Sequence, residues 1–396
     1  MKKLFFLFLF FSLVPLNGCW GLHELNELTI VTGMGIDKGE DHRFLVTLEF
    51  LNAPALEEEQ GTQISAIIFS LEGDSVAEIV KKMNVLATRK LIFSHMRTLV
   101  ISHEIAEEGF FNFFEFYESD REIRNDFNIV IVENAKARDV LKVIYPIQKV
   151  PTMKLSVQLR TMVEEWGGDP DMRLKQLLSA LLSPGREPVL AQIEVFGPVE
   201  KGNTLRNIEK VDLDTFVGLE GLAIFKGMKY IGVLPVSDTR NFLLLQDKLE
   251  RTSITANCGE DLITTARIIN SKTKIKARYK NGTPSFHINI ELEGRVETTQ
   301  CADDLSELKT ILEYEKNLGE SFEKEIMNTI KVMQETYQSD IFGFGEHMER
   351  QDYKNYKKVK DNWNEEFAKA EIDLNLKLRL RRTGLTSQPF MIEIEK

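Results

Sequence analysis

Cys19 is the residue whose surroundings point most directly to a chemical reaction. It closes the segment Leu16-Asn17-Gly18-Cys19, behind a start with two lysines and an apolar run from Leu4 to Leu13. That order is typical of a bacterial lipoprotein signal, which is cut before a cysteine that then carries lipid. We therefore predict a cleaved signal peptide over residues 1–18 and S-diacylglycerol and N-acyl groups on Cys19. An ordinary secretory signal that places Cys19 beside the cut by chance is the alternative.

A lipidated Cys19 would fix the protein to a membrane surface. The apolar run before it is too short to span a bilayer, which takes about 20 apolar residues, and no later segment has that length. Two or more acyl chains give a stable anchor, whereas one chain binds only reversibly. We therefore expect a membrane protein that is lipid-anchored and does not span.

Composition limits the fold and the partners. The chain has 396 residues, of which 43% are hydrophobic, enough for two or three cores. Its formal charge of −11 becomes −13 without Lys2 and Lys3, which argues against a nucleic-acid partner. After Cys19, only Cys258 and Cys301 remain. They could pair in an exported protein, but we favour two separate buried thiols because cysteine is so rare in this chain.

The other reactive residue types form no complete motif. His23 and His103 each precede a glutamate as in a zinc-protease helix, but glutamate stands where the second histidine ligand belongs. Ser271 and Ser321 each lie three residues before a lysine, without the companion motifs of a serine acyltransferase. We therefore predict no catalytic, metal-binding or cofactor-binding residue and no enzyme activity.

Hydrophobic periodicity predicts an α+β chain of several lobes with mixed or antiparallel sheets. We expect an N-terminal α+β domain over residues 20–200, with two lobes as an open alternative, and a C-terminal α+β domain over residues 214–396. The first should contain the hairpin 28–50, strands 64–71, 97–101 and 127–132, and helices 75–87, 104–117, 155–166 and 172–182. The second should contain the hairpin 219–234, strands 262–269, 272–280, 285–297 and 374–380, and a long helix 305–337 crossing a sheet.

Two segments carry an unusual side-chain pattern. The predicted helix 104–117 holds six aromatic residues between Phe110 and Tyr117, and we favour a buried helix over a membrane-dipping one because no basic face accompanies them. Basic residues gather near the C-terminus of an acidic chain, where we favour a solvated face over docking to lipid headgroups or an acidic partner. They are Lys354, Lys357, Lys358, Lys360, Lys377, Arg379, Arg381 and Arg382.

Several motifs together resemble those of a known family, the Ger(x)C lipoproteins, which are the C subunits of spore germinant receptors. The motifs are Cys19-Trp20, Glu24–Leu28, Ile30-Val31-Thr32-Gly33-Met34-Gly35-Ile36-Asp37, Asp120–Arg124, Glu220–Lys226, Gly232–Leu234, Asp340-Ile341-Phe342-Gly343-Phe344-Gly345-Glu346, Trp363 and Arg381–Gly384. In the block 340–346 we expect Gly343 and Gly345 to permit positive φ and Phe342 and Phe344 to fill a core.

The resemblance implies a lipid-anchored accessory subunit on the outer face of the spore inner membrane. It implies partnership with two integral membrane subunits, one of them transporter-like, in a receptor that answers small nutrients with ion release and germination. It supplies no catalytic residue, and it leaves direct binding of a small molecule open. Two other classes remain as alternatives: a lipid-anchored solute-binding protein that captures the nutrient itself, and an envelope hydrolase.

Overall fold

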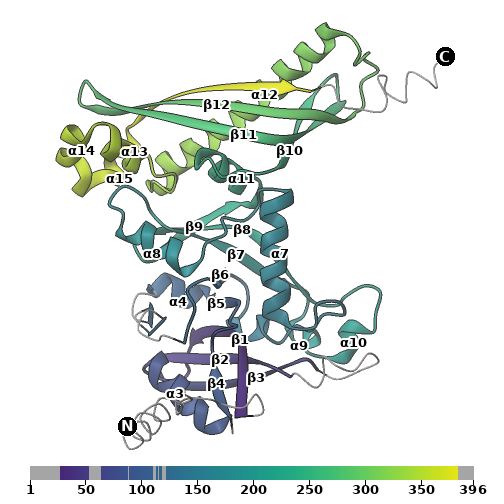
Figure 1. Ribbon diagram of the computed structural model, residues 1–396, viewed down its shortest axis with the longest axis vertical. Coiled ribbons are helices and arrows are strands. Elements are labelled where there is room, and N and C mark those ends of the chain that lie inside the picture. Colours follow the sequence, from purple (N-terminus) through teal and green to yellow (C-terminus); the bar gives the residue numbers. More distant parts are fainter. Residues whose placement is uncertain are drawn as a thin grey trace, which may run out of the picture.

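The computed structural model describes residues 27–52, 64–87, 89–109, 113–114, 116–117 and 122–381. Within these residues the strands form a nine-stranded and a four-stranded sheet, which lie toward opposite ends of the long axis (Figure 1). Helices pack against both sheets, so the predicted α+β class is confirmed. The predicted signal peptide and Cys19 lie outside the described residues.

The large sheet is mixed and has the order β3-β2-β1-β5-β6-β7-β8-β9, with β4 beside β1. The strands from β1 through β5 and β6 to β7 run parallel, and antiparallel strands flank them on each side. Its strands are β1 (Leu28–Lys38), β2 (Phe44–Leu51), β3 (Ala66–Gly73), β4 (Lys90–Ile92), β5 (Thr98–Ser102), β6 (Asn128–Val132), β7 (Val189–Phe196), β8 (Phe216–Lys226) and β9 (Lys229–Pro235).

Helices cover the large sheet on both faces. Alternate residues of β5 and β6 point to opposite sides, where one core includes α3, α4 and α8 and a second core includes α6 and α7. All five residues of β5 and of β6 are buried, as expected of parallel strands between two helical layers. The helices of this part are α3 (Val76–Leu86), α4 (His103–Glu108), α6 (Ala137–Val140), α7 (Pro151–Glu165), α8 (Leu174–Leu182), α9 (Val199–Gly202), α10 (Leu205–Ile208) and α11 (Val236–Leu245).

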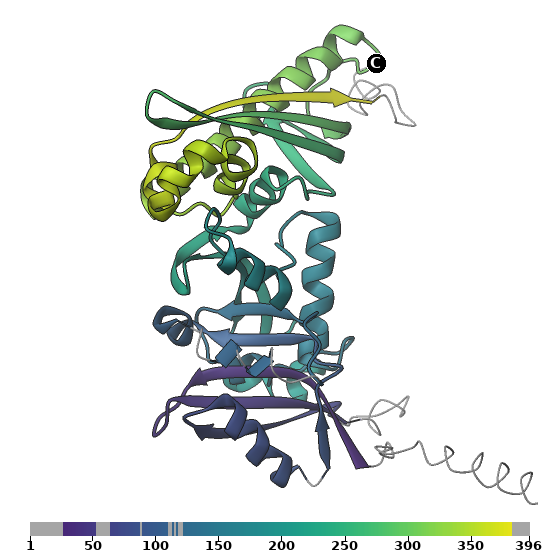
Figure 2. The same ribbon diagram turned by 60° about the vertical axis from the view of Figure 1, so that its left-hand side comes forward.

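The small sheet has the order β10-β11-β12-β13, in which only β12 and β13 run parallel. Helix α12 runs obliquely across it (Figure 2), and its buried residues Leu318, Phe322 and Ile326 join the core that the strands share. This confirms the predicted long helix across a sheet. The elements are β10 (Thr252–Asn257), β11 (Ile263–Lys280), β12 (Thr283–Thr299), α12 (Leu308–Val332), a π-helical turn (Met333–Tyr337), α13 (Phe344–Gln351), α14 (Tyr353–Val359), a 3-10 turn (Lys360–Asn362), α15 (Trp363–Ala368) and β13 (Glu371–Leu380).

Three predicted elements differ from the structure. Helix α4 ends at Glu108 because Gly109 adopts φ 93°, so the predicted helix 104–117 is interrupted. The predicted strands 262–269 and 272–280 form one strand, β11, whose register shifts between Ile268 and Asn270 absorb the irregularity. Gly319 does not interrupt α12, since it lies buried within the helix against β13.

Three of the aromatic residues after α4 are buried, as predicted, and Phe116 is partly buried. Phe113, Phe114 and Tyr117 expose 2 to 3% of their surface and contact one another through their rings. Tyr117 also contacts Phe127 beside β6, so these rings belong to the core of the large sheet. Phe110 and Phe111 lie outside the described residues.

The preference for separate thiols at Cys258 and Cys301 is wrong, because the two residues form a disulfide. Cys258 follows β10 and Cys301 follows β12, and each of these strands pairs with β11. Antiparallel pairing brings the two strand ends together, which leaves the Cα atoms 6.2 Å apart. The low number of cysteines in the chain does not predict how β10 and β12 pair with β11, and this pairing brings the two cysteines together.

The boundary between the two predicted domains falls between β7 and β8. These strands pair with each other along their length, from Val189 with Ile224 to Phe196 with Phe216. Residues 197–215 between them hold the short helices α9 and α10. Strands β8 and β9 therefore extend the large sheet, and the small sheet begins at β10.

Candidate functional site

The block 32–37 shapes the packing of helices against β1. A Cβ atom on Gly33 would lie 2.1 Å from Cγ2 of Thr152 in α7, and one on Gly35 would lie 3.0 Å from Leu141 after α6. Asp37 accepts hydrogen bonds from the first two backbone N–H groups of α6, at Ala137 (2.6 Å) and Arg138 (2.9 Å). The two glycines therefore let helices approach the strand closely, and the aspartate fixes the start of one of them.

A buried glutamate lies in the same layer. Glu49 in β2 is 0% exposed, and its carboxylate accepts hydrogen bonds from the hydroxyls of Thr32 (2.7 Å) and Thr152 and from the Thr152 backbone N–H (3.3 Å). Burial raises the pKa of Glu49 to about 7, although these donors oppose the shift. The group joins β1, β2 and α7, and Thr32, Glu49 and Thr152 are all buried, so its arrangement is structural.

Asp340 organises the block 340–346. Its carboxylate accepts from the backbone N–H groups of Gly343 and Gly345 (2.9 Å each) and from Nε1 of Trp363 (2.8 Å). Burial raises the pKa of Asp340 to about 6, against the effect of these donors. Trp363 lies 23 residues further on, so a single side chain explains why the block and the tryptophan occur together.

The two glycines of this block have different roles. Gly343 has φ 80° just before α13, as predicted. The prediction of positive φ at Gly345 is wrong, because Gly345 lies inside α13 and is needed for space: a Cβ there would lie 2.5 Å from Cα of Gly185. Phe342 and Phe344 are 2% and 0% exposed, which confirms that they fill a core.

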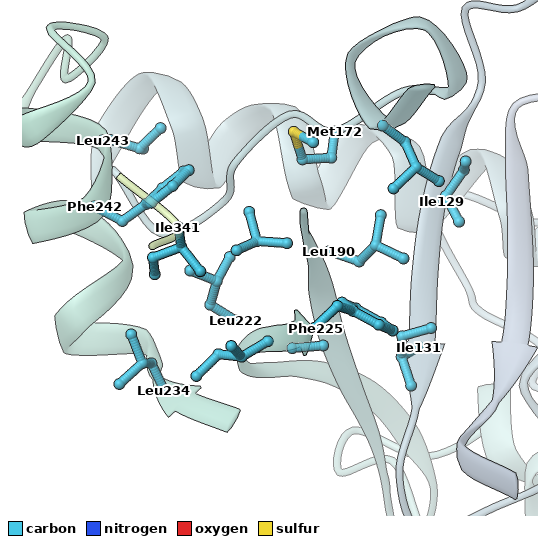
Figure 3. Packing of buried hydrophobic residues seen from close by; sticks show 14 of the residues in the cluster. Ile129, Ile131, Met172, Leu190, Leu222, Phe225, Leu234, Phe242, Leu243 and Ile341 are labelled. Carbon is cyan, nitrogen blue, oxygen red and sulfur yellow. The ribbon is translucent and has the colours of Figure 1, made fainter. Parts of the chain in front are cut away.

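The same block joins the small-sheet part to the large sheet. Its backbone carbonyl at Asp340 accepts from Glu187 N–H (2.8 Å), and Ser339 Oγ donates to the carbonyl of Phe225 in β8 (3.0 Å). Figure 3 shows Ile341 beside Phe242 of α11 and Leu222 of β8 in the shared core. The block 340–346 is therefore a structural junction between the two parts of the molecule.

Hollows on the surface of the described residues include two that are lined by charged side chains. One of about 270 Å³ lies beside the junction, between α8 and α11, and is lined by Lys175, Arg186 and Lys248 among others. The other, of about 520 Å³, lies near the ends of β1 and β5, where His103 contacts Glu133 (2.7 Å between Nδ1 and Oε2) and Glu107 (3.2 Å between Nε2 and Oε1). In the described residues no group of three or more His, Cys, Asp or Glu side chains is arranged to hold a metal ion.

The serine–lysine pairs do not form a site for acyl transfer. Ser271 and Lys274 lie three residues apart on strand β11, so their side chains project to opposite faces of the sheet. Ser271 Oγ instead donates to the carbonyl of Leu249 (2.8 Å). Ser321 and Lys324 lie on α12, where Lys324 shares a face with Ser321 but no hydrogen bond joins them among the described contacts.

The structure separates the basic residues that the sequence groups near the C-terminus. Lys354, Lys357, Lys358 and Lys360 are exposed on α14 and the turn after it, at one end of the small sheet. Lys377 and Arg379 are exposed on the second half of β13, whose arrow points to the other end, and Arg381 is exposed just after the strand (Figure 1). Arg381 pairs with Glu293, and Arg382 lies outside the described residues. The residues do not form one docking surface.

Exposed apolar side chains gather where the described chain begins. Leu28 pairs with Lys90, and Leu51 pairs with Ala66, so the start of β1, the start of β3 and the end of α3 lie at one end of the large sheet. Apolar side chains between 43 and 82% exposed lie here and along the first half of β3; they are Ile64, Ile67, Phe69, Val85 and Leu86. We call these five residues the apolar end. In the described part of the chain, no helix is long and apolar enough to cross a membrane.

Comparison with known proteins identifies the family. A model described as "Spore germination protein N-terminal domain" matches residues 22–195, and one described as "Spore germination B3/ GerAC like, C-terminal" matches residues 220–384. "Spore germination protein KC" of Bacillus subtilis (strain 168) is 27% identical over 98% of this chain and 97% of its own length. "Spore germination protein B3" of the same strain is 21% identical over 95% and 96%.

A solved structure supports the fold. The crystal structure of the GerBC protein matches with a TM-score of 0.55 and 18% identity, over 88% of this chain and 96% of that chain. The two family models together span both sheets and include the junction block with Asp340 and Trp363. The chain therefore belongs to the Ger(x)C family of spore germination proteins.

Proposed function

We propose that this protein is a lipid-anchored accessory subunit of a nutrient receptor in the spore inner membrane, where it acts in germination through two integral membrane subunits. The observation that carries the proposal is the family match over both halves of the chain, joined to the lipoprotein signal that ends at Cys19. The disulfide between Cys258 and Cys301 supports a site outside the cytoplasm, because disulfides persist in oxidising compartments.

The short tether sets which end of the protein would face the membrane. Eight residues lie between Cys19 and Leu28 at the start of β1, so an extended chain joins these two residues over about 30 Å at most. Leu28 lies at the apolar end, so lipid on Cys19 would hold Ile67 and Phe69 close to the bilayer. The small sheet would then stand away from it (Figure 1).

We assign the apolar end to contact with extracytoplasmic loops of the two membrane subunits. Exposed apolar patches rimmed by polar residues mark protein interfaces, and this patch lies where anchored partners would meet it. The second candidate, a solute-binding protein, usually has two similar doubly wound lobes around a cleft. The two sheets here differ in strand number, strand direction and helical cover, which favours the accessory subunit.

The anchor is tested by Cys19→Ala and membrane fractionation of spores. We expect the variant to leave the membrane fraction, because a chain without acyl groups lacks a stable anchor. Asn17→Ala is the matched control, since it changes the same segment and keeps the cysteine. A Cys19→Ala protein that stays bound after a high-salt wash and supports normal germination would contradict the proposal.

The partner surface is tested by Ile67→Glu with Phe69→Glu. We expect lower recovery of the membrane subunits in co-purification, because charges on an apolar contact surface must be desolvated. Leu312→Glu on α12 is the matched control, since Leu312 is 53% exposed and lies in the small-sheet part. Equal recovery with both variants would exclude the apolar end as the contact.

A further inference from the structure

The hollow beside the junction has an apolar lining like that of a small-ligand site. Its volume of about 270 Å³ falls just below the usual range for drug-sized ligands, about 300 to 1,000 Å³. Met172, Val189, Phe242 and Ile341 line it with apolar surface, and all four side chains are buried. Figure 3 shows Met172, Phe242 and Ile341 in the packed layer. A ligand here would be a small molecule with a compact apolar part.

Three cations, Lys175, Arg186 and Lys248, line this hollow. Arg186, whose side chain is 18% exposed, has Nε 3.3 Å from Glu346 Oε1. Among the described residues, Lys175 and Lys248 have no carboxylate oxygen within ion-pair distance of Nζ. Burial, followed by the nearby Arg186, lowers the pKa of Lys248, although Glu346 and Asp171 act in the opposite sense. Lys175 and Lys248 both keep exposed surface, so an anion in the hollow can reach their ammonium groups from solvent.

The carboxylate that does line the hollow is engaged elsewhere. Glu187 Oε1 accepts from Asn364 Nδ2 and Oε2 accepts from the Gly227 backbone N–H, both at 2.6 Å. Two strong hydrogen bonds hold this side chain toward Gly227 and Asn364, and among the described residues no ion pair joins it to Lys175 or Lys248. The three cations still outnumber this one carboxylate in the lining. The hollow therefore keeps a surplus of positive charge in an acidic protein.

One buried acceptor in the lining lacks a donor. Oε1 of Gln176 is buried and, among the described atoms, receives no hydrogen bond. The other amide in the lining, on Gln246, is already used, because its Nε2 donates to the carbonyl of Phe342. An unsatisfied buried acceptor is costly, and a ligand hydroxyl or ammonium group would satisfy it once the Gln176 side chain turns toward the hollow.

We propose that the hollow between α8, α11 and Ile341 binds a small carboxylate that carries a hydroxyl or ammonium group. Lys175, Lys248 and Arg186 would hold the carboxylate, and Gln176 Oε1 would accept from the neighbouring donor. The inference goes beyond the proposed function, because an accessory subunit could act without any ligand of its own. The ligand would contact both α8 and the junction residue Ile341, so binding would stabilise the junction.

The test is isothermal titration of the full chain in detergent with L-lactate and L-serine. Their amides, L-lactamide and L-serinamide, are matched probes without the carboxylate. We expect the acids to bind and the amides not to bind. Lys175→Gln with Lys248→Gln should weaken binding at least about tenfold, because each lost charged contact contributes about 1.5 kcal/mol or more. Lys274→Gln, an exposed lysine on β11, should bind as the wild type does.

A second variant tests the contact to the hydroxyl or ammonium group separately from the contact to the carboxylate. Gln176→Leu should weaken lactate and leave acetate unchanged, since acetate lacks the donor. Thermal unfolding of each variant without ligand shows that the fold is retained. No binding of either acid at millimolar concentration, or equal binding by wild type and the double lysine variant, would overturn the inference. Neither result bears on membrane anchoring or partner recovery, which test the proposed function separately.

Discussion

The large sheet is covered by helices on both faces, whereas the small sheet is covered on one. In β5 and β6 every residue is buried, but along β11 the exposed Lys272, Lys274 and Lys276 alternate with the buried Thr273 and Ile275. A sheet between two helical layers gains stability from packing on both sides. The small sheet packs against helices on one face only, and a disulfide links the ends of two of its strands.

The two parts also differ in where they bury charge. The large sheet buries Glu49 and Asp37 beside helices that need hydrogen-bond acceptors, and the small-sheet part buries Asp340 at the junction. The open face of the small sheet instead carries charges in water. Buried carboxylates thus mark places where elements meet, and the following changes test each of these places.

The largest effect is expected at the junction, from Gly345→Val. A side chain there meets the backbone of Gly185, which cannot move away cheaply, so we expect a loss of about 3 kcal/mol or more in the free energy of unfolding. Gly343→Val should cost about 1 to 3 kcal/mol from positive φ alone. Chemical denaturation measures both values.

Gly227→Val is the control for backbone strain. Gly227 has φ 60° but no atom within 4 Å of an added Cβ, so it reports the conformational cost without a clash. A Gly345 variant no less stable than the Gly227 variant would show that close packing at the junction is unimportant.

The next effect is expected at the disulfide, from Cys301→Ser. The bond closes a loop with a sequence separation of 43, and removing a link of this kind costs about 2 to 4 kcal/mol. Destabilisation should be confined to the small-sheet part, which hydrogen exchange of β10 and β12 amides would show. Cys258→Ser with Cys301→Ser should behave like the single variant, and mass spectrometry of unreduced wild-type protein should find the two peptides linked.

A smaller, pH-dependent effect is expected at Glu49. Its pKa rises from 4.5 to about 7 on folding, so the folded state holds a proton that the unfolded state releases between these values. Stability from this group is therefore present below pH 4.5 and is lost as the pH rises to about 7, by up to about 3 kcal/mol. In the Glu49→Gln variant, the free energy of unfolding should depend less on pH over this range. A variant with the wild-type slope would assign the dependence to other groups.

The smallest effect is expected from Lys357→Glu with Lys358→Glu on α14. Both side chains are exposed, and surface substitutions usually change stability by less than about 0.5 kcal/mol. We also expect unchanged recovery of membrane partners, because these lysines lie apart from the apolar end. Reduced recovery at low salt that disappears at high salt would instead show electrostatic docking.

The sequence predicts elements where one local signal dominates. Asn281-Gly282 fixes the hairpin between β11 and β12, and both residues adopt positive φ. The helical spacing of Leu318, Phe322 and Ile326 predicts α12. Other outcomes depend on residues far apart in the chain: Gly345 needs the room left by Gly185, and Cys258 meets Cys301 only through strand register. A pattern within a short stretch of sequence does not predict contacts between residues that lie so far apart in the chain.

The parallel pairing of β12 and β13 also determines when this protein can finish folding. Ser285 pairs with Glu371 and Gly294 pairs with Leu380, so the partner strand arrives 86 residues later in the chain. Contacts between such distant residues slow folding, because a long loop must close before any pairing is gained. During synthesis the edge of β12 therefore stays unpaired until nearly the whole chain has been made, and a chain cut short before residue 371 would expose that edge to aggregation.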